Sequence, residues 1–235
     1  MGCFSDLVAD VPPEVKEILE TVGTKCPDIV NSFVIKAQSL DKDKAEMIDE
    51  RHTKVDEADK SDKKKLEEIL LEYNKKEVEN EKELILNEVE KMRAIYELGL
   101  ELADKLKEIT LKQLKEKLNK APEMSKALIN RQIDEVNNYS SKEFLFSPYG
   151  KPLKNALEKQ GMREDELKDF TKKLEKERKE RRKKERDEFK LDKNEFPPED
   201  DLVFNVDDLY KAIFDEYKSE FKSQIASKIF KAVTK

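Results

Sequence analysis

The fold of this chain is decided by residues 84–118, which read LILNEVEKMRAIYELGLELADKLKEITLKQLKEKL. Apolar side chains recur in this stretch at steps of three and four residues, which is the spacing of one face of an α-helix. No proline interrupts the pattern before Pro122, and Gly99 is its one poor helix former. The stripe is wider than the two positions per heptad of a coiled coil. It therefore favours packing against several helices over pairing with a single one.

The same pattern begins upstream, near Leu66, but a polar run over residues 74–83 is relieved there only by Val78. One alternative is a single long helix over residues 60–120, about 90 Å long at 1.5 Å per residue. The other is a break within the polar run. We build the predicted architecture around the single long helix.

Two shorter apolar patterns precede it. Residues 14–22 have helical spacing after Pro12 and Pro13, and Gly23 predicts the end of this helix. Residues 28–37 predict a second short helix, and both need a partner for their apolar faces. The sequence therefore predicts a packed helical hairpin, followed by a solvated charged helix over residues 41–65.

The C-terminal third combines a charged and an apolar helix. Residues 175–187 contain no apolar side chain, and acids precede bases by four residues, which is typical of a solvent-exposed helix. After Pro197 and Pro198, the last helix carries one apolar face from Leu209 to Val233.

Together these patterns predict an all-α, elongated helical bundle around one long central helix, with an exposed charged helix and a C-terminal amphipathic helix. Four segments are expected within one domain. They are an N-terminal arm and hairpin (1–40), a long helical core (41–138), an aromatic loop (139–152) and the charged and amphipathic C-terminal helices (153–235).

Composition argues against several function classes. Charged residues make up 43% of the chain and the formal net charge is −6, which gives no reason to expect a nucleic-acid partner. No apolar run approaches the roughly 20 residues that span a bilayer. His52 is the only histidine, and no Gly-rich phosphate loop or zinc-ligand spacing occurs. We therefore predict no catalytic residues, no metal site and no cofactor.

The two cysteines, Cys3 and Cys26, lie close together near the N-terminus. A disulfide between them would stabilise the fold by about 3 kcal/mol in the chain-entropy model and would indicate an oxidising compartment. The alternative is two free thiols in a cytoplasmic protein.

Aromatic side chains gather in the expected loop, around Pro148, Gly150 and Pro152. They form a candidate binding loop, because loops on a rigid scaffold often carry function, or they cover one end of the core. The four are Tyr139, Phe144, Phe146 and Tyr149.

Residues 172–186 contain ten basic residues and four glutamates. This is a candidate patch for an anionic partner, but the interleaved glutamates and the lack of aromatics favour a solvated helix. The candidate residues are Arg178, Arg181, Arg182, Lys183, Lys184 and Arg186.

These observations predict a non-catalytic, secreted helical binding protein for a protein partner or an apolar, lipid-like small molecule. The alternative is an intracellular coiled-coil structural or adaptor protein that self-associates through the long helix. Either a monomer or a homodimer is compatible with the sequence.

Overall fold

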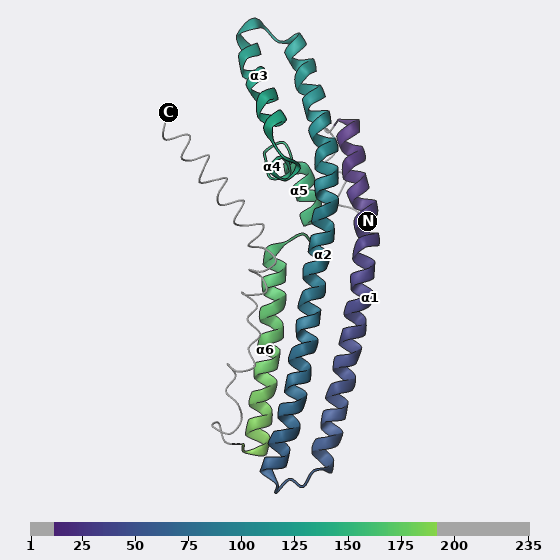
Figure 1. Cartoon of the computed structure of the whole chain (residues 1–235), viewed down its shortest axis with the longest axis vertical. Helices are drawn as coiled ribbons and strands as arrows, with labels where there is room; N and C mark the ends of the chain where they lie inside the picture. The colour runs from purple at the N-terminus through teal and green to yellow at the C-terminus, as the bar shows by residue number, and fades with distance from the viewer. Residues whose placement is uncertain (1–11, 192–235) are drawn as a thin grey trace, which may run out of the picture. The chain divides into compact units, whose positions relative to one another are not determined.

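The computed structural model describes residues 12–191, and this part of the chain contains six α-helices and no β-strand (Figure 1). The helices are α1 (Pro13–Glu57), α2 (Lys63–Lys120), α3 (Glu123–Asn138), α4 (Ser141–Leu145), α5 (Lys151–Glu158) and α6 (Glu164–Phe189). The predicted all-α helical bundle with a long helix is confirmed. The expected C-terminal amphipathic helix lies outside the described residues. Within residues 12–191, no helix is both long enough and apolar enough to cross a bilayer.

The chain divides into two compact units. Of the described residues, unit 1 contains 12–37 and 90–166, and unit 2 contains 38–89 and 167–191. Helices α1 and α2 therefore each contribute one part to both units, whereas α3, α4 and α5 belong to unit 1.

Unit 2 is a three-helix arrangement of α1, α2 and α6. Helix α1 runs antiparallel to α2, because Leu40 contacts Asn80 while the later Glu50 contacts Tyr73. The amide of Asn80 donates to the Leu40 carbonyl at 3.0 Å. One end of this unit is closed by an apolar cluster from all three helices and the residues that follow α6. Its buried members are Val55, Leu66, Ile69, Leu70, Tyr73 and Leu191.

Unit 1 begins with the first part of α1 packed antiparallel to the last part of α2. Three cross-helix ion pairs keep one constant register: Lys112–Glu14 at 2.7 Å, Lys25–Glu101 at 4.0 Å and Lys36–Glu90 at 3.8 Å. Helix α3 then turns back along α2, since the ammonium group of Lys107 donates to carbonyls at the end of α3. Val136 is buried in this contact.

Helices α4 and α5 complete the core of unit 1. They approach α2 closely at Gly99, where a Cβ atom would lie 2.5 Å from the Leu157 side chain. Leu145, Leu153 and Leu157 are fully buried. Gly150 joins the two short helices, and a Cβ there would lie 2.2 Å from the Phe144 carbonyl oxygen. Only glycine fits this position without a backbone shift.

The N-terminal hairpin prediction is wrong, because α1 continues without a break through Gly23 and Pro27. Val22 and Cys26 are fully buried on the inner face of α1, on either side of Gly23. Gly23 is exposed and has open space around its Cα. Burial of the inner face outweighs helix-propensity costs of about 1 kcal/mol for glycine and about 3 kcal/mol for proline.

Two further expectations concern the charged stretches. The polar run at residues 74–83 contains no break, because α2 is continuous over 58 residues. The solvated-helix prediction for residues 41–65 is also wrong: this part of α1 buries Arg51 and Val55 in unit 2. In both stretches buried charged residues form ion pairs with neighbouring helices, as Arg51 does with Glu185 and Glu81 does with Arg178.

Candidate functional site

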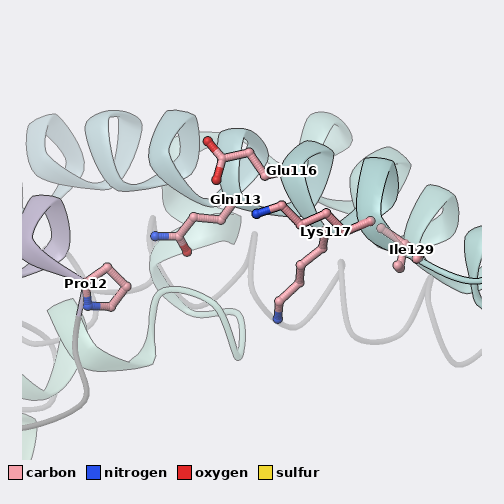
Figure 2. Close-up of a pocket in the computed structure, with 7 residues that line it drawn as sticks. Pro12, Gln113, Glu116, Lys117 and Ile129 are labelled. Carbon is pink, nitrogen blue, oxygen red and sulfur yellow. The ribbon is translucent and has the colours of Figure 1, made fainter.

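An open pocket of about 600 Å³ lies at the end of unit 1, where α2 turns into α3 (Figure 2). Figure 2 shows Pro12 on one side, Ile129 of α3 on the other, and α2 side chains between them. The lining mixes apolar and basic groups. Its residues are Pro12, Gln113, Glu116, Lys117, Lys120, Ala121 and Ile129.

Helix α3 carries apolar side chains on two different faces. Ile129, Ile133 and Val136 are half-buried or buried. On another face Met124 is 97% exposed, Leu128 is 63% exposed, and Ala127 between them is also exposed. At about 100° per residue, the two sets lie roughly 140° apart around the helix. We call Met124, Ala127 and Leu128 the apolar strip, and it is uncovered by any described residue.

Basic residues surround this strip in the sequence. Residues 112–131 contain six basic and two acidic residues, a net charge of +4 in a chain whose net charge is −6. Lys112 pairs with Glu14, and Lys126 pairs with Glu123. The other four basic side chains are exposed and form no ion pair with another described residue. They are Lys115, Lys117, Lys120 and Arg131.

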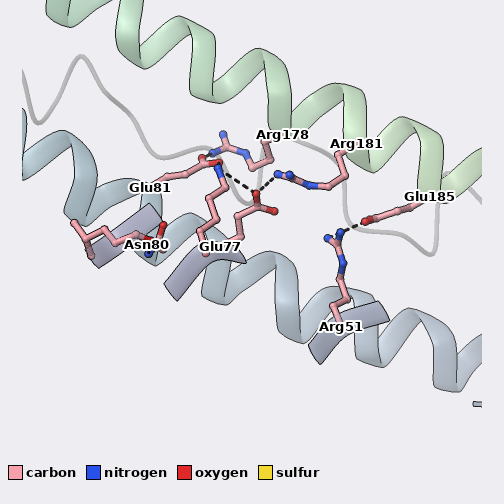
Figure 3. A network of polar contacts seen from close by, with 9 residues as sticks. Arg51, Glu77, Asn80, Glu81, Arg178, Arg181 and Glu185 are labelled. Atoms are coloured by element: carbon pink, nitrogen blue, oxygen red, sulfur yellow. Dashed lines mark hydrogen bonds and ion pairs between the residues drawn. The ribbon is translucent and has the colours of Figure 1, made fainter. Parts of the chain in front are cut away.

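A second polar feature lies inside unit 2, where charged side chains of three helices meet (Figure 3). We call it the polar layer. Its residues are Lys44, Arg51, Asn74, Glu77, Asn80, Glu81, Arg178, Arg181, Arg182 and Glu185.

Local sequence explains why α6 points charges into the layer. Its buried positions are spaced by three or four residues, as in any amphipathic helix. Leu167, Thr171 and Leu174 occupy the first of them. Arg178, Arg182 and Glu185 continue the same face. The inward-facing side of α6 is therefore apolar in its first half and charged in its second half.

The buried glutamates of α2 in the polar layer are paired with cations of α1 and α6. Arg178 donates to Glu81, and Arg181 donates to Glu77. The ammonium group of Lys44 lies 3.6 Å from Glu77 and 3.4 Å from Glu81. This pairing offsets the cost of removing the carboxylates from water.

Burial still dominates the ionisation of two carboxyl groups. It raises the pKa of Glu81, although Arg178 and Lys44 act in the opposite direction. It also raises the pKa of Glu185, against the effect of Arg51. Burial and the nearby Arg51 lower the pKa of Arg181. Perturbed pKa values occur both at catalytic sites and in structural ion-pair networks. Here Glu81 and Glu185 each form an ion pair with an arginine, as in a structural network.

Asn74 is the exception in the layer. It is fully buried, and neither the nitrogen nor the oxygen of its amide has a hydrogen-bond partner. Asn80, one and a half turns further along α2, uses its nitrogen to bind the Leu40 carbonyl. Asn74 therefore adds an unsatisfied polar group to the layer.

The predicted aromatic loop is mostly helical. Ser140 and Glu143 form a capping box that starts α4. Phe144 is fully buried and stacks on Tyr149 with a centroid distance of 6.5 Å. Burial, reinforced by Glu135, raises the pKa values of Tyr139 and Tyr149.

Phe146 is 39% exposed and lies 6.4 Å from the ring of Tyr96, measured between centroids. Phe144 therefore belongs to the core of unit 1, whereas Phe146 stays partly exposed beside Tyr96. Phe144 has no surface left for a partner.

The candidate basic patch is divided by the fold. Arg178 and Arg182 are buried, and Arg181 faces Glu77. Lys183 and Lys184 are exposed, and Arg186 is half-buried. The prediction of a fully solvated helix is wrong for the inner face of α6, because the glutamates of α2 supply counter-charges there.

Cys26 is buried and forms no disulfide with another residue of the range 12–191, and burial raises the pKa of its thiol. Its predicted partner, Cys3, lies outside the described residues.

The apolar strip was not predicted from the sequence. The signal was present, because Met124 and Leu128 fall on a different helical face from Ile129, Ile133 and Val136. The chain matches no protein-family model, no curated protein and no solved structure.

Proposed function

We propose that this chain is a non-catalytic helical binding protein that recognises an apolar, lipid-like ligand at the end of unit 1. The observation that carries the proposal is the apolar strip, in which Met124 is 97% exposed and Leu128 is 63% exposed. Large apolar side chains that project together into water often mark a binding surface.

A neighbouring pocket lies on the other face of α3 and adds a second apolar surface at the same end of unit 1. It lies between α2 and α3, and Ile129 lines it from the helix that carries the strip. Its volume of about 600 Å³ is within the range of small-molecule sites. Apolar groups beside lysines suit a ligand with an apolar body and an anionic head.

Self-association through the long helix is the alternative function. The apolar side chains of α2 that would form such an interface are largely buried within the two units. Leu70 and Tyr73 are buried in unit 2, and Ile95 and Leu102 are buried in unit 1. A coiled-coil partner using this stripe would have to displace helices of the same chain, so the binding function has more support.

The proposed location is outside the cell, with the cytoplasm as the alternative. It depends on the predicted Cys3–Cys26 disulfide, and Cys3 would have to reach a fully buried side chain. Peptide mapping under non-reducing conditions, after alkylation of the native protein, tests this. A bridged peptide supports secretion, whereas separate alkylated peptides remove its basis.

The binding proposal is tested with a fluorescent fatty-acid probe and the full chain. The double variant M124S/L128S should bind the probe more weakly than the wild type. The matched control is V34S/I35S, which removes two exposed apolar side chains of α1. Equal binding by both variants, or no binding by the wild type, would contradict the proposal.

A further inference from the structure

We infer that the apolar strip and the basic residues around it form a surface that binds anionic lipid membranes. This inference rests on the proposed function and names its ligand: the headgroup and acyl boundary of a bilayer that contains acidic lipids. The first step concerns geometry. Met124 occupies the second position of α3, directly after the turn at Ala121 and Pro122, so the strip lies at the tip of the α2–α3 hairpin.

The second step concerns charge. Lys115, Lys117, Lys120 and Arg131 are exposed on α2 and α3 and form no ion pair with another described residue. Each such cation near an anionic membrane surface raises the affinity of the protein for that surface by about fivefold. The chain as a whole is acidic, with a net charge of −6, so the attraction depends on this local excess and not on overall charge.

The third step decides between a membrane and a protein partner. A stable protein interface buries about 800 Å² on each side and needs a central group of large anchors. The strip offers two large apolar side chains, Met124 and Leu128. Interfacial membrane binding has no such minimum area, because its strength is the sum of the apolar area that enters the acyl boundary and the attraction of basic residues to anionic lipids. The observed combination fits a membrane better than a protein.

The experiment is co-sedimentation of the full chain with vesicles. One set contains phosphatidylcholine only, and the other contains phosphatidylcholine with about 30 mol% phosphatidylserine, a composition with a negative surface potential. We expect binding to the phosphatidylserine vesicles, weaker binding at high salt, and none to phosphatidylcholine. Binding that is equal for both vesicle types would overturn the inference.

Two pairs of variants locate the surface. K117A/K120A should lose roughly 30-fold in affinity for the anionic vesicles, and M124S/L128S about tenfold or more. The matched controls are K183A/K184A, which removes two exposed lysines of α6, and V34S/I35S. Both controls should bind like the wild type. Circular dichroism confirms that every variant keeps its helical content.

The outcomes separate this inference from the proposed function. Strip-dependent binding of the fatty-acid probe without vesicle binding overturns the membrane inference and keeps the binding function. If the wild type binds neither the fatty-acid probe nor the vesicles, the proposed function and the membrane inference are both wrong. If M124S/L128S changes the mass of the protein in analytical ultracentrifugation and leaves vesicle binding unchanged, the strip is a contact between two copies of the chain, and the inference is wrong.

Discussion

Arg51 of α1 and Glu185 of α6 form an ion pair inside unit 2, with a distance of 2.8 Å between guanidinium nitrogen and carboxylate oxygen. Both side chains are at least nine-tenths buried. The pair joins two helices that run in the same direction along α2. Arg51 lies in a stretch whose composition indicates a solvated helix, and so does Glu185. Two helical segments that the sequence predicts to be solvent-exposed therefore pack against each other through this ion pair.

Replacing Arg51 with alanine should destabilise unit 2. The variant leaves Glu185 buried without its closest cation, and we expect the free energy of unfolding to fall by about 3 kcal/mol at neutral pH. Urea denaturation followed by circular dichroism measures this change. As a control, K42A removes an exposed ion pair with Glu46 and should cost much less stability than R51A. If the two variants lose equal stability, the buried pair has no special role.

Glu185 should also give unit 2 a characteristic pH dependence. Burial raises its pKa in the folded state above the ordinary value of 4.5. Its contribution to stability is therefore complete below pH 4.5 and is lost as the pH rises through the folded-state pKa. E185Q cannot ionise, so the free energy of unfolding of the wild type minus that of E185Q should fall across this window.

A surface carboxylate gives the opposite sign. A hydrogen bond from Lys76 lowers the pKa of Glu72, so the contribution of Glu72 is present above its ordinary value of 4.5 and is lost as the pH falls. The wild type minus E72Q should therefore rise with pH. Denaturation of the wild type and both variants at several pH values checks the two slopes. If the free energy of unfolding changes with pH in the same way for E185Q and the wild type, folding does not change the pKa of Glu185, and the prediction is wrong.

Two asparagines of α2 should respond in opposite ways to the same substitution. Asn74 is fully buried without a hydrogen-bond partner, so N74L should stabilise the protein by about 1 kcal/mol or more. The Asn80 amide donates to the Leu40 carbonyl, so N80L should destabilise it by about 1 kcal/mol. Urea denaturation compares them. A loss of stability in N74L would show that its amide is satisfied in solution.

Two glycines should likewise differ. In G150A the new methyl group would lie 2.2 Å from a backbone oxygen, and we expect a loss of about 2 kcal/mol or more. In G23A nothing lies within 4 Å, and alanine in a continuous helix should add roughly 0.5–1 kcal/mol. Thermal denaturation measures both changes. A destabilised G23A variant would indicate that α1 ends near this residue, as the sequence predicts.

The sequence predicted the candidate functional site only in part. The four aromatic residues were identified as neighbours, but the segment is mostly helical, and Phe144 is fully buried. The basic stretch was identified as well, but Arg178 and Arg182 face inward. Pairs spaced by four residues stabilise an exposed helix, and they give no information about which face meets counter-charges on another helix.

The sequence by itself determined that the chain is helical and where the long helix lies. The apolar stripe of α2 and its end before Pro122 are local properties, because helix formation depends on neighbours within about four residues. Only the tertiary structure decided that α1 passes Gly23 and Pro27, that the polar layer is buried, and that no residue from 12 to 191 covers Met124 and Leu128. These features depend on contacts between helices distant in the sequence, such as Arg178 with Glu81, and no local pattern encodes those contacts.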